Sequence, residues 1–410
     1  MANTLKFGNG EWYGKKDTIL AYNDLNSNYK PLPFNFSRDS SRTVVNKDGL
    51  IEEVGSGQPR IDYLNNTKGA LKLEPSRTNI VEYSEDGTQW DAINTTVSLT
   101  TDSTSPSGQS SVYKVNDNAN DAQHRVDVRP SVTSGTEYAF SVFVKKPSDS
   151  DIDFVYLIFT NKFNITRFYF NIAEGTSLDS GGTIESYGNG WYRLSANATA
   201  NSSGNGFFGV NLTNANNNTT YSGTGNGSMF VWGAQVESNA SYPTSYIPTS
   251  GSSVTRVADV CNNGGNDQVI NSTEGVLYWE ASALADDGTD RRISLSDGTL
   301  NNYVSIGYSR FSGNIIAEMF SGGVLQTSDW GATGFSQTNN NKFAMSWGSG
   351  TMKFYVNGTQ TNTESVSSPS GLNVLEFNTA VDTLNMYAKV KGIQVFNYAL
   401  TDEELQTLTT

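Results

Sequence analysis

The chain has 410 residues, a length that fits roughly two or three domains of ~100–200 residues each. Its formal net charge is −14, and an acidic surface of that size repels phosphate groups. A general nucleic-acid binder is therefore excluded. Only 17% of the residues are charged, whereas 11% are aromatic and 39 are glycine. Aromatic and β-branched residues between turn formers predict an all-β protein with many short strands.

Cysteine and histidine each occur once, as Cys261 and His124. One cysteine excludes a disulfide within the chain, and one histidine excludes a metal site built from several histidines. Cys261 stands in a stretch rich in Gly and Asn that is typical of a linker, which argues against a nucleophilic pair with His124. We interpret His124 as an ordinary strand residue.

The N-terminus lacks the pattern of a secretory signal, because no basic segment is followed by an apolar one. No stretch of the chain approaches ~18 consecutive apolar residues. We therefore expect neither a signal peptide nor a membrane span, and a protein made in the cytoplasm of its host.

Residues 1–85 contain short apolar islands between turns, such as Pro31–Phe36 and Asn46–Ile51. They show no sustained periodicity of either a helix or a strand. A segment of this kind is hard to close as an independent domain. We predict that residues 1–85 form an extended N-terminal arm that attaches the protein to a larger particle or to its own oligomer.

Residues 86–260 show one strand pattern after another. Tyr138–Val144 alternates as a half-buried strand does, and Phe154–Phe159 is apolar on both faces, as in the centre of a sheet. Further strands are expected at 167–170, 191–194 and 229–232, separated by turns of Gly, Asn and Ser. We predict one β-sandwich, similar to a carbohydrate-binding module.

A second series of strands follows a Gly-, Ser- and Asn-rich linker, and residues 261–410 predict a second sandwich. Asn357-Gly358 indicates a type I′ hairpin. Thr401 and Glu404 have the spacing of a capping box, which predicts a short C-terminal helix. The expected fold class is thus all-β, with an N-terminal arm, two jelly-roll or lectin-like β-sandwiches and one short helix. We expect a fragment that starts near Asp267 to fold alone.

Seven short motifs occur along the first two thirds of the chain. They are Arg42–Glu52, Pro59–Tyr63, Leu73–Asn79, Gly190–Arg193 (GWYR), Trp232–Glu237 (WGAQVE), Ser245–Thr249 (SYIPT) and Thr255–Asp259. Together they resemble a segment that recurs in bacteriophage virion proteins, chiefly tail-fibre, head-fibre and other surface structural proteins. The resemblance implies a location on the virion, other virion proteins as partners, and a homo-oligomer with a trimer as the expected form.

Residues 274–410 resemble the concanavalin A-like, laminin G-type lectin sandwich. Phe354–Gly358 and the ending Val395–Leu405 carry this resemblance. It implies a lectin-like fold that contacts host-surface or mucus glycans. Sandwiches of this kind also include glucanases, and they often hold Ca²⁺.

Catalysis and metal binding have weaker support in the residues. A glycosidase needs two carboxylates that flank the scissile bond, and the E-x-D-x-x-E strand of glucanases on this fold does not occur. We therefore expect no catalytic residues. Hard oxygen ligands for Ca²⁺ are available, but no Asp-x-Asp-x-Asp-Gly loop is present. Ca²⁺ therefore stays an open alternative without assigned ligands, and no other cofactor is expected. The acidic residues that could offer oxygen ligands are Asp286, Asp287, Asp290 and Asp297.

Carbohydrate binding predicts exposed aromatic rings, since the C–H faces of sugars stack on Trp and Tyr while carboxylates bind the hydroxyls. Trp330 stands beside Asp329 in a stretch with the composition of a loop, and Tyr303 is a further candidate. These three residues form the predicted carbohydrate-binding set. The alternative for Trp330 is a ring packed under a loop. Four other tryptophans lie in alternating strands and are expected in the core: Trp191, Trp232, Trp279 and Trp347.

The function that these features favour is that of a non-enzymatic phage structural protein, displayed on the virion as an adhesin that contacts glycans. One alternative is a purely architectural capsid-decoration or tail-adaptor protein. Another, with less support, is a polysaccharide depolymerase.

Overall fold

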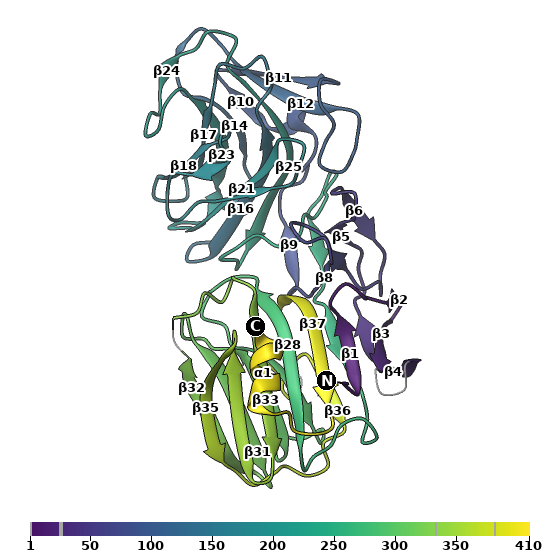
Figure 1. Cartoon of the computed structure of the whole chain (residues 1–410). Coiled ribbons are helices and arrows are strands. Elements are labelled where there is room, and N and C mark those ends of the chain that lie inside the picture. Colours follow the sequence, from purple (N-terminus) through teal and green to yellow (C-terminus); the bar gives the residue numbers. More distant parts are fainter. Residues whose placement is uncertain (1, 24–27, 333, 381–382) are drawn as a thin grey trace. The chain divides into compact units, whose positions relative to one another are not determined.

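Antiparallel β-strands are the main regular structure of the computed structural model, which describes residues 2–23, 28–332, 334–380 and 383–410 (Figure 1). Within these ranges, the one α-helix is α1 (Asp402–Thr409), near the C-terminus. The predicted all-β class with a short terminal helix is therefore confirmed. No helix in the described part of the chain is long and apolar enough to cross a membrane.

The chain is divided between two compact units whose bounds differ from the predicted domains. Unit 1 comprises Met1–Ser41, Val54–Pro75 and Val257–Thr410, and unit 2 comprises Arg42–Glu53 and Ser76–Arg256. The chain therefore passes from one unit to the other four times. The prediction of a separate arm at residues 1–85 is wrong, because this segment contributes strands to both units. The predicted start of the last domain, at residue 261, lies a few residues beyond the final passage.

Unit 2 is a sandwich of two sheets. Its six-stranded sheet has the order β10 (Asp91–Ile93), β14 (His124–Val128), β23 (Phe207–Thr213), β17 (Phe154–Thr160), β18 (Thr166–Asn171) and β19 (Thr176–Ser177). The eight-stranded sheet has the order β11 (Thr95–Thr100), β12 (Val112–Asp117), β25 (Ser228–Ser238), β16 (Glu137–Lys145), β21 (Trp191–Thr199) and β20 (Thr183–Ser186). Beside β25 lies β9 (Arg77–Asn79), which also pairs with β26 (Val254–Arg256).

Short pairs of strands and one 3-10 turn complete unit 2. The pairs are β13 (Asp121–Ala122) with β24 (Tyr221–Ser222), β15 (Ser131–Val132) with β22 (Gly204–Asn205), and β5 (Arg42–Val45) with β6 (Ile51–Val54). The turn is η2 (Gly87–Gln89).

Aromatic rings from both sheets meet in the core of unit 2. Phe140 of β16 lies edge-on to Phe159 of β17, with 6.3 Å between the ring centroids. The strand β16 is buried on both faces, so the half-buried pattern predicted for it is wrong. Its second face is covered because Phe143 packs against Tyr187 and Trp232, at 4.9 and 5.2 Å. By contrast, β17 lies inside its sheet, as its continuous apolar run predicted.

Unit 1 is also built from two sheets. The long sheet has the path β27 (Val260–Asn262), β4 (Asn28–Ser37), β3 (Thr18–Asn23), β1 (Leu5–Gly8), β37 (Ala388–Phe396), β28 (Gly275–Ala283), β33 (Asn341–Gly348), β34 (Thr351–Val356) and β35 (Thr359–Ser365). Its side branches are β2 (Gly14–Lys15), β7 (Ile61–Asp62) and β8 (Ala70–Lys72). The second sheet has the order β32 (Val324–Ala332), β31 (Ile315–Ser321), β30 (Tyr303–Tyr308), β29 (Arg291–Ser296) and β36 (Val374–Glu376).

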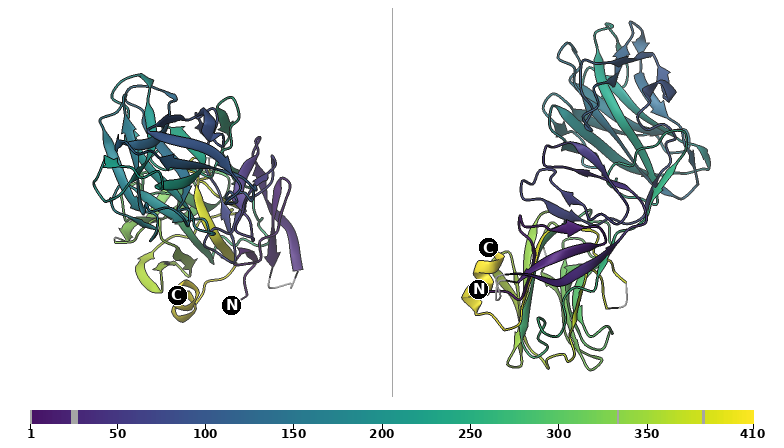
Figure 2. Two further views of the ribbon diagram at one scale, coloured as in Figure 1. Left: turned by 90° about the horizontal axis from the view of Figure 1, so that it is seen from above. Right: turned by 90° about the vertical axis from the view of Figure 1, so that its right-hand side faces the viewer.

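The N-terminal strands are part of the long sheet of unit 1. Strand β1 pairs with β37 from Leu5↔Val395 to Gly8↔Gly392, and both figures show its purple ribbon in the same unit as the green and yellow strands (Figures 1 and 2). Leu5 and Phe7 are fully buried there, in one core with residues of β28, β33 and β37. Burial of this apolar surface holds the N-terminal segment in place.

Several of the sequence motifs meet in a buried network of charges in unit 1. The carboxylate of Asp259 accepts from Arg38 at 3.2 Å, from Arg60 at 2.8 Å and from the backbone N–H of Glu74 at 2.8 Å. Glu74 forms a second ion pair with Arg60, at 2.8 Å. Each of these side chains is almost completely buried. Opposite charges and hydrogen bonds together offset the cost of burying such groups.

The motifs of unit 2 build a second buried polar network. Asn79 donates to the carbonyls of Ala234 and Ile247 at 3.2 and 2.9 Å, and Arg193 donates to the carbonyl of Thr244 at 2.8 Å. The register of β25 against β16 shifts at a bulge next to Gly233, whose φ is +64°. Glycine suits this position because it has no side chain and adopts positive φ readily. The motifs thus hold the segment after β25 against its sheet.

The local signals near the C-terminus are confirmed. Asn357 and Gly358 have φ of 47° and 80°, as a type I′ turn requires, and they join β34 to β35. Thr401 accepts from the backbone N–H of Glu404, while the Glu404 carboxylate accepts from the backbone N–H of Thr401, so the capping box is complete. The four strand tryptophans are buried as expected.

Candidate functional site

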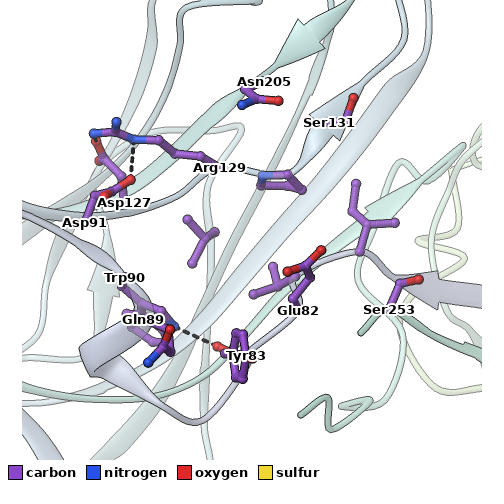
Figure 3. A pocket seen from close by; sticks show the side chains of 14 residues that line it. Glu82, Tyr83, Gln89, Trp90, Asp91, Asp127, Arg129, Ser131, Asn205 and Ser253 are labelled. Carbon is purple, nitrogen blue, oxygen red and sulfur yellow. Dashed lines mark hydrogen bonds and ion pairs between the residues drawn. The ribbon is translucent and has the colours of Figure 1, made fainter. Parts of the chain in front are cut away.

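A pocket of about 610 Å³ lies in unit 2, beside the edge strand β10 of the six-stranded sheet (Figure 3). Five separate parts of the chain line it: residues 80–83, residues 89–91, residues 127–131, and the single residues Asn205 and Ser253. The pocket therefore exists only in the folded unit.

The segment before β10 is held in shape by its own hydrogen bonds. The indole N–H of Trp90 donates to the carbonyl of Tyr83 at 2.8 Å, which ties together the two ends of this stretch. Asp86 caps η2 by accepting from the backbone N–H of Thr88 at 3.0 Å and from the hydroxyl of Tyr113 at 2.9 Å. Hydrogen bonds from Thr88 and Tyr113 hold the pKa of the Asp86 carboxyl below its usual value. The loop is thus pre-formed.

The floor of the pocket is apolar and its mouth is polar. Val81, Trp90 and Val128 are each less than a tenth exposed, whereas Tyr83 is 36% exposed. The exposed polar side chains around them end in carboxylate, amide or hydroxyl groups: Glu82, Gln89, Asp91, Ser131, Asn205 and Ser253. An apolar floor with a small number of polar groups around it is the usual construction of a small-ligand site.

Arg129 connects two carboxylates at one side of the pocket (Figure 3). Its Nε lies 2.7 Å from Asp91 Oδ2, and its Nη2 lies 3.4 Å from Asp127 Oδ2. Asp127 is also bound by Arg125, whose Nε lies 3.1 Å away. Burial raises the pKa of the Asp127 carboxyl, although both arginines oppose that change. The guanidinium of Arg129 is held further by the ring of Phe207, 4.1 Å from its centroid.

These groups suit reversible binding of a polyhydroxylated molecule. Aromatic and aliphatic side chains offer contact to C–H groups, and amides, hydroxyls and carboxylates offer hydrogen bonds to hydroxyl groups. Hydrolysis needs two carboxylates that reach the same bond. The Asp127 side chain is fully buried and paired with two arginines, so it cannot take one of these roles without leaving its partners.

The three residues predicted from the sequence to bind carbohydrate lie in unit 1, on its five-stranded sheet. Tyr303 in β30 is only 6% exposed; its ring stacks on Phe320 at 4.8 Å, and its hydroxyl donates to Glu318 at 3.3 Å. Its face is therefore not open for a sugar. Asp329 and Trp330 belong to the edge strand β32, which corrects the expected loop. Their side chains lie outside the described part of the structure.

The sheet register shows how far apart these candidates stand. Tyr303 pairs with Phe320 of β31, and Asp329 pairs with Ala317, three residues along the same strand. The five-stranded sheet therefore places Tyr303 on β30 and the other two residues on β32, with β31 between them, and it does not gather Tyr303 into an exposed aromatic surface.

The four aspartates considered for Ca²⁺ have separate partners. Asp287 pairs with Arg291 at 2.7 Å, Asp290 with Arg310 at 3.5 Å, Asp286 with the hydroxyl of Ser312, and Asp297 with Asn302 at 2.9 Å. In the described part of the chain, no group of three acidic, His or Cys side chains is placed to hold a metal ion.

The single histidine and cysteine are both structural. His124 is fully buried in β14, and its ring nitrogens lie 2.7 Å from the carbonyl oxygen of Asn94 and 3.1 Å from that of Tyr221. Cys261 is buried in the core of unit 1, and burial raises the pKa of its thiol. His124 belongs to unit 2 and Cys261 to unit 1.

Sequence reasoning did not identify the pocket in unit 2. The one local signal was Trp90, which stands outside any alternating strand and between the amide of Gln89 and the carboxylate of Asp91. The remaining lining residues come from strands and connecting segments whose spatial arrangement the sequence does not state.

No protein-family model matches the chain, and no curated protein matches it. Among solved structures, it is similar to the CBM40 of the Ruminococcus gnavus IT-sialidase bound to α2,3-sialyllactose, with 16% identity and a TM-score of 0.31 over 36% of this chain and 92% of that one. It is similar to the Caenorhabditis elegans galectin LEC-6, with 20% identity and a TM-score of 0.24 over 30% and 83% of the two chains.

A third similar structure is the SAP-like pentraxin of Limulus polyphemus, with 14% identity and a TM-score of 0.26 over 34% of this chain and 70% of that one. At these scores the likenesses assign neither a function nor a site to this chain. The pocket is therefore interpreted from its own residues.

Proposed function

We propose that the chain is a non-enzymatic structural protein of a phage particle that binds glycans through the pocket of unit 2. The observation that carries the glycan-binding part is the apolar floor of Val81, Trp90 and Val128 below an exposed tyrosine and a rim of hydrogen-bonding groups. The virion location rests on the sequence motifs alone.

The buried networks support the structural part of the proposal. The motifs that resemble phage surface proteins supply Arg60, Glu74 and Asp259, which hold unit 1 together, and none of the motif residues lines the pocket beside β10. Their role here is to stabilise a scaffold, while the glycan contacts come from residues outside the motifs. Labelling phage particles of the encoding strain with an antibody against the chain tests the virion location.

The glycan-binding part predicts the effect of removing one exposed ring. Tyr83→Ala in the full chain should weaken glycan binding by ~0.5–1.5 kcal/mol, up to about tenfold, because an aromatic contact to the sugar is lost. Binding to a glycan array and calorimetry with the best array ligand measure this. The free energy of unfolding should change little, because the Tyr83 ring is 36% exposed.

The matched control is Tyr13→Ala, which removes an exposed tyrosine of unit 1 that does not line the pocket. It should leave binding unchanged. The proposal is contradicted if no glycan binds the full chain, or if both variants lose affinity equally. Release of reducing ends from a bound polysaccharide would overturn its non-enzymatic part.

A further inference from the structure

The charged side chains of the pocket are paired except for one. Arg129 is paired with Asp91, and Asp127 is paired with Arg125 as well as with Arg129. Glu82 is exposed, and among the described residues it has no ion-pair partner. Arg129 is the only cation that lines the described pocket. The pocket therefore keeps one unbalanced negative charge.

We propose that this pocket binds glycans that carry a positively charged amino group, placed between the Glu82 carboxylate and the Tyr83 ring. The inference rests on the proposed function and adds the class of glycan. Figure 3 shows Glu82 and Tyr83 next to each other at the pocket. An ammonium group there gains from the carboxylate and from the face of the aromatic ring.

The same charges disfavour glycans with carboxylate or sulfate groups. The guanidinium of Arg129 is the one cationic group that lines the described pocket, and it is already shared between Asp91 and Asp127 and packed on Phe207. An anionic sugar would have to separate those pairs while it approaches Glu82. The net charge of −14 opposes such a ligand further at low salt.

Three oligosaccharides of equal length test the inference on the full chain: chitosan (free amino groups), chitin (neutral acetamides) and oligogalacturonate (carboxylates). Calorimetry at mildly acidic pH keeps the amino groups charged while exposed carboxylates stay ionised. Chitosan should bind about three- to tenfold more tightly than chitin at low salt, the range expected for one partly exposed charge pair. Oligogalacturonate should bind least, and added salt should reduce the preference.

Glu82→Gln should remove the preference for chitosan and leave the affinity for chitin unchanged. Its matched control is Glu174→Gln, which makes the same change at an exposed glutamate of unit 2 outside the pocket and should keep the preference. Tighter binding of oligogalacturonate, equal binding of chitosan and chitin, or an unchanged preference in Glu82→Gln would overturn the inference while glycan binding stands. If none of these sugars nor any array glycan binds, the proposed function fails and the inference fails with it.

Discussion

Asp259 shows how one carboxylate can connect three distant parts of a chain. It binds Arg38, Arg60 and the backbone of Glu74, and none of these contacts is local in the sequence. A buried carboxylate with fewer partners would be costly, whereas two guanidinium groups and a backbone N–H satisfy it. This accounts physically for Arg60, Glu74 and Asp259 in the motifs that resemble phage proteins.

A neighbouring carboxylate predicts how unit 1 responds to acid. Burial alone would raise the pKa of Asp62, but the charges of Lys72 and Lys389 and a hydrogen bond from the Leu64 N–H outweigh it, so the pKa lies below its usual value. The stability from this group is therefore present above the usual pKa of aspartate, ~3.9, and is lost as the pH falls through the lower value of the folded state.

Asp62→Asn should lower the free energy of unfolding at neutral pH by about 2 kcal/mol, because it removes one of the carboxylates that pair with the buried Lys72, at 3.2 Å, and leaves it the pair with Glu74 at 3.5 Å. The loss of stability in acid should become shallower. Denaturant titrations over a series of pH values measure both effects. Asp267→Asn, at an exposed position of unit 1, is the control and should match the parent protein. A parallel pH profile in Asp62→Asn would contradict the argument.

At the scale of elements, the sequence predicts best those turns and helix ends whose conformation depends on residues close by in the chain. The hairpin at Asn357-Gly358 and the helix after Thr401 depend on backbone angles and caps, and both form as predicted. The placement of Trp330 failed because Ser, Asp and Gly around it are turn formers, whereas pairing with β31 keeps this stretch extended. Tertiary pairing outweighed local propensity there.

The helix α1 offers a test of its cap. Thr401→Ala should cost about 1 kcal/mol, because it leaves the backbone N–H of Glu404 without the side-chain acceptor of Thr401. Faster hydrogen exchange in the first turn of the helix should report the loss. Thr407→Ala, at an exposed position of the same helix, should not speed exchange, since alanine is a better helix former. Equal exchange in both variants would count against the role of the cap.

At the scale of the whole molecule, the sequence predicted two sandwiches, but it did not predict which segments of the chain form each one. Strand β1 pairs with β37, which lies almost at the other end of the chain. The residues of a short strand do not indicate which distant strand it pairs with. For the same reason the pocket, built from five separate parts of the chain, could not be assembled from the sequence. Residues 1–85 lacked periodicity because they supply short strands to sheets that other segments complete.

Because N-terminal strands complete unit 1, we no longer expect a fragment that starts near Asp267 to fold alone. Among the residues that the structure describes, nine members of the core of unit 1 precede it: Leu5, Phe7, Ile19, Ala21, Phe34, Phe36, Leu71, Leu73 and Cys261. Each large one contributes about 2–5 kcal/mol, and together they exceed the ~5–15 kcal/mol stability of a typical protein.

Residues 267–410 expressed alone should therefore aggregate or show no cooperative thermal unfolding by circular dichroism, while the full chain unfolds cooperatively. Co-expression with residues 1–75 should increase the soluble yield, because it restores the partner of β37. A sharp melting transition of the isolated fragment would show that the N-terminal strands are dispensable.

The four passages of the chain between the units also constrain how genes for such proteins can recombine. A crossover at the last passage, between Arg256 and Val257, would take unit 2 from one parent. Unit 1 would then be a mosaic, with β1 inherited from one parent and β37 from the other. Exchange of the C-terminal part between relatives is therefore viable only where the N-terminal strands of the recipient match the incoming sheet, so selection should keep the gene segments that encode β1 and β37 together.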